Sequence, residues 1–168
     1  MWGSTTPNTA YECTWVNTPF NGGASNYDEE YFNSVKDTVC PNGVLAKEYD
    51  AASQIMGGVW RMPTQTDFQE LLSGTTNEWV TDYNGTGVSG RKFTSKTDTS
   101  KHIFIPAAGY CNGGSVYDVG SSGRVWSSSL LTSVPLFAWY LGFNSDDCGM
   151  GSYGGSRYLG WSVRGVFK

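Results

Sequence analysis

One long stretch near the C-terminus limits the choice of fold more than any other part of the sequence. From Leu130 to Gly160 it is rich in Gly, Ser and Tyr and contains no Lys, Glu or Gln, which are residues that usually solubilise a protein surface. The glycines between Gly149 and Gly155 argue against a helix and predict a folded-back loop that presents aromatic side chains. This is the chemistry of an antibody-like binding surface, although an ordinary glycine-rich loop of a β-protein has the same composition.

Alternation within this stretch predicts a strand with one buried face and one exposed face. The predicted inward residues are Trp139, Leu141 and Phe143, and the predicted outward residues are Tyr140, Gly142 and Asn144. Aromatic residues can belong to the core, but this stretch holds more of them than one face of a small sheet can bury. We therefore expect some to be exposed, and an exposed aromatic patch is more often a partner site than an accident.

The length and charge of the chain exclude several classes of function. With 168 residues it is expected to be a single domain, residues 1–168, with one well-packed core. Its net charge of −4 and its scattered Lys and Arg residues argue against binding to nucleic acid or to an acidic membrane surface. No apolar run is long enough to span a bilayer, so membrane insertion is not expected. No signal peptide is recognisable, which says little about export because domain-like sequence begins at once.

The reactive side chains form no recognisable catalytic pattern. Cys13, Cys40, Cys111 and Cys148 lie far apart and lack the CxxC spacing of zinc or redox sites. We expect independent free thiols, with a Cys13–Cys40 bridge as the less favoured alternative. His102 is the only histidine, and its place in a predicted strand favours a solvent-facing or structural role over general-base catalysis.

Calcium binding is considered because many sugar-binding domains depend on it. The tripeptides that supply calcium ligands in such domains, Glu-Pro-Asn, Gln-Pro-Asp and Trp-Asn-Asp, do not occur in the chain. The run 144–147, Asn-Ser-Asp-Asp, offers suitable oxygen atoms, but adjacent polar residues in a turn more often cap the backbone. We therefore expect no metal and no cofactor.

Two helices are predicted in the first half of the chain. Apolar residues recur at helical spacing over 45–56, and Gly57 ends that helix. Thr64 is expected to cap a second helix with Asp67 in an approximate capping box, and Gly74 ends it. The predicted buried face of this second helix contains Phe68, Leu71 and Leu72.

The remaining segments are predicted to be strands and loops. Residues 10–16 are expected to form a first strand, and 17–42 a polar surface loop with at most one helical turn around 29–35. From Glu78 onward β-structure dominates. The predicted strands there are 79–83, 90–94 and 102–106, followed by a turn-rich segment around 116–117 that leads into 124–126. Helices followed by many short strands predict an α+β fold with a mixed sheet.

Several sequence blocks together match the pattern of one known family. The blocks are Trp2-Gly3-Ser4, Asp50-Ala51-Ala52, Gly57-Gly58-Val59-Trp60-Arg61-Met62-Pro63-Thr64, Phe68-Gln69-Glu70-Leu71-Leu72, Ile103-Phe104-Ile105-Pro106-Ala107-Ala108-Gly109-Tyr110, Trp126-Ser127-Ser128-Ser129 and Ser162-Val163-Arg164. With these blocks the chain resembles the Fibrobacter succinogenes major paralogous domain. The blocks follow in order from residue 2 to residue 164. Two positions depart from the family pattern: Gly165, where Pro or Cys is commoner, and Cys111, where a polar residue is usual.

The resemblance implies a C-type-lectin-like fold with two helices on a twisted, mainly antiparallel sheet. Many members of this family are variable proteins of diversity-generating retroelements, in which the adenines of template Asn codons become any base. Such codons never yield Trp, Met, Lys, Glu or Gln, and residues 130–160 contain only Trp139 and Met150 of these types. The resemblance also implies a frame that includes Trp60, Trp126, Trp139 and Arg164, the last hydrogen-bonded to buried carbonyl groups.

The same resemblance implies a variable ligand-binding region within 126–168. Its expected contact residues are Leu131, Val134, Leu136, Phe137, Tyr140, Gly142, Asp147, Cys148, Gly149, Gly151, Ser152, Tyr153, Gly154, Tyr158 and Leu159. The expected partner is a protein or a surface glycan, recognised outside the cell by a bacterial surface protein or by the tail of a phage virion.

Two alternatives stay open at this point. The family is related to formylglycine-generating enzymes, which use a pair of reactive cysteines, and only Cys111 and Cys148 could supply one here. The placement of Cys148 in the variable stretch argues against such an enzyme. The other alternative is an invariant structural domain of a surface lipoprotein.

Overall fold

The structure is a computed structural model, and it describes residues 1–167. Its α-helices are α1 (Glu29–Val39), α2 (Ala51–Met56) and α3 (Gln65–Gly74), and its 3-10 turns are η1 (Ala10–Glu12), η2 (Pro41–Gly43), η3 (Lys47–Tyr49) and η4 (Tyr83–Gly85). Its strands are β1 (Thr75–Val80), β2 (Gly90–Ser95), β3 (His102–Pro106), β4 (Tyr110–Asn112), β5 (Ser115–Tyr117), β6 (Gly123–Leu130), β7 (Phe137–Phe143), β8 (Cys148–Met150) and β9 (Gly155–Ser156). This mixture of helices and antiparallel strands agrees with the predicted α+β class.

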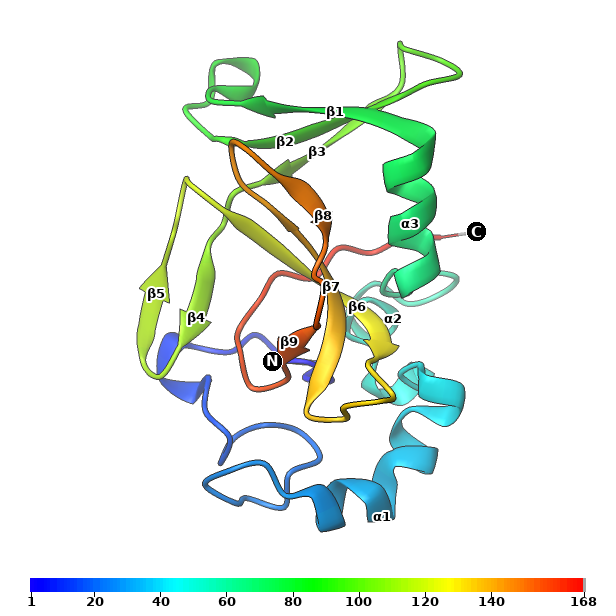
Figure 1. Cartoon of the computed structure of the whole chain (residues 1–168), viewed down its shortest axis with the longest axis vertical. Helices are drawn as coiled ribbons and strands as arrows, with labels where there is room; N and C mark the ends of the chain where they lie inside the picture. The colour runs from blue at the N-terminus through cyan, green and yellow to red at the C-terminus, as the bar shows by residue number, and fades with distance from the viewer. Residues whose placement is uncertain (168) are drawn as a thin grey trace.

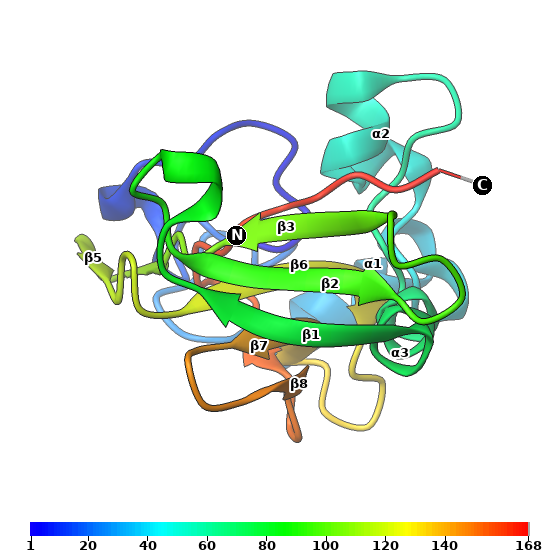
Figure 2. The same cartoon turned by 90° about the horizontal axis from the view of Figure 1, so that it is seen from above.

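The strands form separate antiparallel groups. Strands β1, β2 and β3 form one sheet, β4 and β5 a hairpin, and β6, β7 and β8 a second sheet to which β9 adds by pairing with β7. The β1–β3 sheet lies at one end of the molecule and α1 at the other, with β6 and β7 between them (Figure 1). Seen from above, β1–β3 overlie β6 and β7, with α3 alongside (Figure 2).

Helix α3 forms where the sequence predicts it. The Thr64 side chain accepts a hydrogen bond from the Asp67 backbone N–H at 3.2 Å, and the Asp67 carboxylate accepts one from the Thr64 N–H at 2.7 Å. This reciprocal capping satisfies donors that the first helical turn leaves free. Phe68 is buried, and α3 passes directly into β1 at Thr75. The first strand therefore begins earlier than the predicted 79–83.

The core consists of two clusters of buried side chains. The Trp126 cluster contains Trp2, Phe32, Val39, Cys40, Leu45, Ala51, Ala52, Met62, Trp126, Leu130, Ala138 and Trp161. The Phe68 cluster contains Phe68, Phe93, Ile105, Val125, Leu141 and Phe143. Neighbouring residues of β6 and of β7 contribute to different clusters, so both faces of these two strands are covered.

The covered faces correct the predicted alternation of β7. Leu141 and Phe143 are buried, as predicted, but Trp139 is only half-buried. Tyr140, predicted to face outward, is half-buried and packs on the Trp126 cluster. The assumption that one face of this strand meets solvent was wrong, because the C-terminal segment lays Trp161 against Tyr140 with 4.4 Å between ring centroids.

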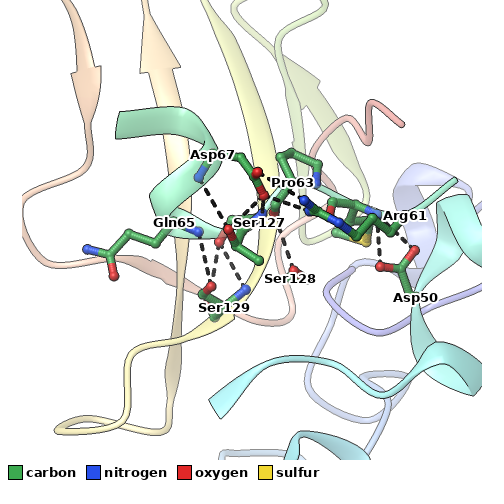
Figure 3. A network of polar contacts seen from close by, with 10 residues as sticks. Asp50, Arg61, Pro63, Gln65, Asp67, Ser127, Ser128 and Ser129 are labelled. Atoms are coloured by element: carbon green, nitrogen blue, oxygen red, sulfur yellow. Dashed lines mark hydrogen bonds and ion pairs between the residues drawn. The ribbon is translucent and has the colours of Figure 1, made fainter. Parts of the chain in front are cut away.

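A network of polar contacts joins α2, α3 and β6 (Figure 3). The Arg61 guanidinium binds the Asp67 carboxylate through two hydrogen bonds, of 2.6 and 2.9 Å. This pairing, followed by the Thr64 hydrogen bonds, holds the pKa of Asp67 well below its usual range. Buried Asp50 accepts hydrogen bonds from the backbone N–H groups of Ser53 and Met62. It thus caps α2 and holds the strand-like segment that precedes α3.

The same network brings together two of the blocks that carry the family resemblance. The Ser128 N–H donates to the Pro63 carbonyl at 2.8 Å, and the Ser129 hydroxyl accepts from the Gln65 N–H at 3.0 Å. On the other side of the strand, the Trp2 indole N–H donates to the Ser127 carbonyl at 2.9 Å. The serine run after Trp126 therefore satisfies backbone groups that would otherwise be buried without partners.

The N-terminal half differs most from the prediction. Residues 10–16 are not a strand, because only the short turn η1 forms there. The segment 17–42 contains a full helix, the 11-residue α1, instead of a single turn. Its N-cap Asp28 accepts a hydrogen bond from the Tyr31 N–H at 2.9 Å, and Phe32 is its buried anchor. The abundance of Asn and Asp hid this helix because those residues also favour turns.

The helix predicted over 45–56 is interrupted. Residues 47–49 form η3, and Asp50 then caps the separate helix α2, which Gly57 ends as predicted. Leu45 and Ala52 are buried, whereas Ile55 and Met56 are exposed. Among residues 1–167 no helix is long and apolar enough to cross a membrane.

Candidate functional site

A polar cleft of about 280 Å³ opens between the start of β6 and strands β7 and β8. Six of the fifteen predicted contact residues line it: Tyr140, Gly142, Asp147, Gly149, Gly151 and Ser152. The remaining lining residues are Ser122, Gly123, Arg124, Phe143, Asn144 and Met150. Strand pairing assembles the cleft, because Gly142 lies opposite Arg124 on β6 and opposite Gly149 on β8.

Glycines let the Tyr140 ring lie across the cleft. A Cβ atom at Gly151 would lie 2.1 Å from Tyr140 Cε1, and one at Gly142 would lie 2.9 Å from Tyr140 Cε2. Both distances are shorter than carbon atoms tolerate, so the ring occupies the space that these two side chains would need. A Cβ at Gly149 would meet nothing within 4 Å. A side chain can therefore be added at position 149 without a clash, but not at position 142 or 151 while Tyr140 is present.

Arg124 is a cleft residue that the sequence reasoning missed. Its guanidinium stacks on Tyr110, with Cζ 4.0 Å from the ring centroid, and lies 5.7 Å from the Trp161 ring. The ion pairs among residues 1–167 do not include Arg124. A stacked, unpaired guanidinium at the cleft wall is available to a ligand with acceptor atoms or an aromatic face. Arg124 lies opposite Gly142 on β7, and this position could have identified it as a cleft residue. The position is known only once the strand register is known.

A cluster of aromatic rings supports the cleft from behind. Trp126 and Trp161 stack with 3.9 Å between centroids, and Tyr140 lies 4.4 Å from Trp161. On the other side of Arg124, Tyr110 stacks on Tyr117 at 5.3 Å. The rings therefore hold Tyr140 and Arg124 in fixed orientations, which lowers the entropy that a ligand would have to remove.

The turn 144–147 forms the rim of the cleft. The Asn144 side-chain oxygen accepts from the backbone N–H groups of Asp146 and Asp147, both at 2.8 Å. Arg91 on β2 donates to the carbonyl groups of Asn144 and Ser145 at 2.8 and 3.3 Å. The oxygen atoms considered as cation ligands thus organise the turn. No group of three or more His, Cys, Asp or Glu side chains within residues 1–167 is placed to hold a metal ion.

Two further predicted residues, Tyr153 and Gly154, form a loop tip beside the cleft. Tyr153 is 81% exposed. Gly154 has a positive φ of 67°, and a Cβ there would lie 2.9 Å from the Ala138 carbonyl oxygen. The glycine therefore permits the tight return of the chain onto β7, and Tyr153 projects from that turn as a free aromatic side chain.

The other seven predicted residues lie outside the cleft lining. Val134 is 42% exposed in the β6–β7 loop, and Leu131, Leu136 and Phe137 nearby are half-buried. Three more pack against other side chains: Tyr158 lies 5.1 Å from Trp15 between centroids, Leu159 contacts the Trp126 cluster, and Cys148 contacts the Phe68 cluster. Burial raises the pKa of the Cys148 thiol to about 11. The structure therefore gathers about half of the predicted set at one opening.

Arg157 shows that this C-terminal stretch also contains frame residues. Its side chain is fully buried, with Nε donating to the Pro135 carbonyl at 2.8 Å and Cζ 3.9 Å from the centroid of the Phe32 ring. Burial lowers the pKa of the guanidinium, but only to about 10, so it stays charged at neutral pH. Arg157 thus ties the β6–β7 loop to α1, a role that its surroundings of Gly, Ser and Tyr did not reveal.

The four residues expected to form the frame differ in how deeply they are buried. Trp126 is fully buried, and Trp60 is half-buried with its ring 4.7 Å from that of Phe167. Trp139 is half-buried. Arg164 is exposed and donates to the Phe104 carbonyl at 3.3 Å, so its expected role at buried carbonyl groups was wrong.

The candidate catalytic side chains lie in different surroundings. Cys111 on β4 faces Cys13 and Gly160, whereas Cys148 on β8 packs on the Phe68 cluster. His102 is exposed on β3, with Nε2 3.1 Å from the Tyr83 hydroxyl. The four cysteines are free thiols, without a Cys13–Cys40 bridge among residues 1–167. In contrast to the expectation, they are not all independent, because Cys13 and Cys111 are neighbours. Comparisons of the chain with protein-family models, curated proteins and solved structures found no match.

Proposed function

We propose that this protein is a ligand-binding protein whose C-terminal residues 131–161 form a retroelement-diversified recognition face. The scaffold is a C-type-lectin-like domain of the Fibrobacter succinogenes major paralogous type. The ligand is a protein or a glycan on another cell surface, bound by a bacterial surface protein or a phage tail. The face consists of the cleft around Tyr140 and the adjoining loop tip at Tyr153.

The observation that carries this proposal is the composition of the cleft. Six residues chosen from sequence alone line one opening together with Arg124, although they come from different strands and loops. The opening combines a tyrosine ring, a guanidinium, a hydroxyl and a carboxylate, and Tyr153 stands exposed beside it. Aromatic and Arg side chains surrounded by small polar residues are typical of binding hot spots.

The arrangement of the frame supports the proposed scaffold. The blocks around Pro63 and Ser128, which carry the family resemblance, are hydrogen-bonded to each other at 2.8 Å. Residues expected to be constant thus hold the strands whose ends and loops carry residues expected to vary. An enzyme of the formylglycine-generating type receives no comparable support, because Cys111 and Cys148 lie in separate environments.

The test measures binding of the purified protein to a glycan array and to intact cells of candidate host bacteria. For whichever surface binds, Tyr153→Ala and Arg124→Ala should weaken binding, and the stronger of the two by about 30-fold or more, which corresponds to about 2 kcal/mol. Tyr153→Ala should leave the melting temperature unchanged because the side chain is mostly in solvent.

The matched control lies on an exposed helix face. Glu70→Ala on α3 removes a solvent-facing side chain distant in sequence from the cleft, and it should leave binding unchanged. If Glu70→Ala or changes in 17–42 weaken binding while the two cleft variants do not, the recognition face lies elsewhere. The gene neighbourhood gives an independent test: the proposal requires a near-identical template repeat beside a reverse transcriptase gene.

A further inference from the structure

Two cysteines from distant parts of the chain meet at Gly160. Cys13 follows the turn η1, and Cys111 is the central residue of β4. A Cβ atom placed on Gly160 would lie 2.4 Å from the Cys13 sulfur and 3.6 Å from the Cys111 sulfur. Because both sulfur atoms lie within 3.6 Å of one point, they are neighbours in the fold. The absence of a side chain at Gly160 provides the room in which they meet.

Backbone hydrogen bonds fix the segments that carry the two thiols. The Cys111 N–H donates to the Gly160 carbonyl at 2.8 Å, and the Gly160 N–H donates back to the Cys111 carbonyl at 3.0 Å. The Gly113 N–H donates to the Cys13 carbonyl at 3.1 Å. A disulfide requires two Cα atoms held close together with suitable Cβ directions. This short backbone bridge between the Cys13 and Cys111 segments supplies such a constraint.

The two thiols differ in how a reagent can reach them. Cys111 is half-buried and lines a cavity of about 440 Å³ between the N-terminal segment, α2 and residues 160–165. Cys13 is fully buried behind it, and its thiol donates to the Thr9 carbonyl at 3.5 Å. Burial, and to a smaller extent the neighbouring Cys111, raise the pKa of the Cys13 thiol. A reagent entering the cavity therefore meets Cys111 first.

The other two cysteines have surroundings that disfavour reaction. Cys40 belongs to the Trp126 cluster and Cys148 packs on the Phe68 cluster. Burial raises the pKa of each of these thiols to about 11, so the reactive thiolate form is scarce at neutral pH.

We propose that Cys13 and Cys111 form a disulfide bond when the protein meets a low-molecular-weight disulfide such as oxidised glutathione. The Cys111 thiolate attacks one sulfur of this oxidant, forming a mixed disulfide and releasing one thiolate. Cys13, on losing its proton, then attacks the Cys111 sulfur and releases the second thiol. The two cysteines are oxidised to one disulfide while the reagent is reduced to two thiols, so electrons and protons balance.

The bond would restrain β4, which lies behind the proposed recognition face. It joins the N-terminal segment to the β4–β5 hairpin, and β4 also carries Tyr110, on which Arg124 stacks. Closing so long a loop restricts the unfolded chain strongly. The oxidised protein should therefore melt higher than the reduced protein by roughly 10 °C. Formation of the bond does not require any ligand.

The test uses the folded protein, first fully reduced and then incubated with oxidised glutathione. After quenching, the protein is denatured, alkylated and weighed by mass spectrometry. Two cysteines should be alkylated instead of four, and a non-reduced tryptic digest should contain peptide 1–36 linked to peptide 102–124. Each cysteine lies in its own tryptic peptide, so the linkage is assigned without ambiguity.

Variants separate this pair from the other thiols. Cys40→Ser and Cys148→Ser should still form the bond, whereas Cys111→Ser should retain all of its remaining thiols. Four alkylated cysteines in the oxidised wild-type protein, a linkage through Cys40 or Cys148, or a glutathione adduct that persists on Cys111 would each overturn the proposal. The wild-type experiment decides the matter even if a variant fails to fold.

Discussion

The network around Thr64 and the cleft around Tyr140 are built in opposite ways. In the network, charged and polar side chains bond to specific partners, as Arg61 does to Asp67 and Asp50 to the Met62 N–H. In the cleft, glycines and the Tyr140 ring fit by shape, and Arg124 stacks on Tyr110 instead of pairing with a carboxylate. Directional hydrogen bonds specify one structure. Packing of a ring against glycine or another ring leaves the polar groups of Tyr140 and Arg124 free to interact with other molecules. The residues that specify the fold are thus separate from those of the proposed recognition face.

The largest expected effect tests whether the aromatic cluster belongs to the frame. Trp126→Ala should lower the free energy of unfolding by about 3–5 kcal/mol, because it removes a fully buried ring stacked on Trp161. Denaturant titration measures the change. Trp126→Phe, which keeps most of the apolar volume, should cost clearly less. A loss for Trp126→Ala below about 1 kcal/mol would mean that the cleft region is not anchored to this core.

A second prediction concerns the shape fit in the cleft. Gly151→Ala should destabilise the protein by about 1–3 kcal/mol, because its Cβ would meet the Tyr140 ring at 2.1 Å. Gly149→Ala, two residues earlier on β8, is the matched control and should change stability by less than about 0.5 kcal/mol, since its Cβ meets nothing within 4 Å. In a double-mutant cycle, Tyr140→Ala should cancel part of the Gly151→Ala cost. If the free-energy changes of the two substitutions were strictly additive, the contact between Tyr140 and residue 151 would be contradicted.

A third prediction is that the polar network around Thr64 makes the stability of the protein sensitive to acid. Asp67 has a folded-state pKa below its ordinary value of 3.8, so its contribution to stability is complete above about pH 4 and is lost as the pH falls further. Asp67→Asn should cost about 1–2 kcal/mol at neutral pH, allowing for the partial exposure of the pair. It should also flatten the decline in stability below pH 4, and Arg61→Met should flatten it as well. Parallel stability curves for wild type and Asp67→Asn would refute this assignment.

The smallest effect is expected at the loop tip. Tyr153→Ala should change the free energy of unfolding by no more than about 0.5 kcal/mol, because the side chain is 81% exposed. Thermal or denaturant melts give the value. A loss as large as that of Gly151→Ala would show that Tyr153 belongs to the packed part of the cleft.

The sequence predicted those elements whose signals are local. Thr64 and Asp67 identified the start of α3, Gly57 identified the end of α2, and β3 was predicted with both of its ends correct. Each of these features depends on a few adjacent residues, which capping and turn chemistry describe well. The helix α1 was missed because its apolar positions are few and its polar residues are equally common in loops.

The parts that could not be predicted depend on contacts between distant segments. The buried side of Tyr140 comes from Trp161, which reaches it only because Ser162 bridges to Val125 on β6. Periodicity within β7 contains no information about this additional layer. Arg157 and Arg124 are likewise defined by partners far away in sequence, so composition alone overlooked both of them.

The contact between Tyr140 and Gly151 has an evolutionary consequence. A larger residue at 151 fits only when 140 becomes small, so the acceptable sequences at these positions come in matched combinations. Changing one codon at a time would pass through an ancestor with either a clash or an unfilled space in its cleft. A copying process that rewrites both codons in one generation avoids that ancestor altogether. Lineages diversified in this way should therefore show positions 140 and 151 changing together, whereas position 149 should drift independently of both.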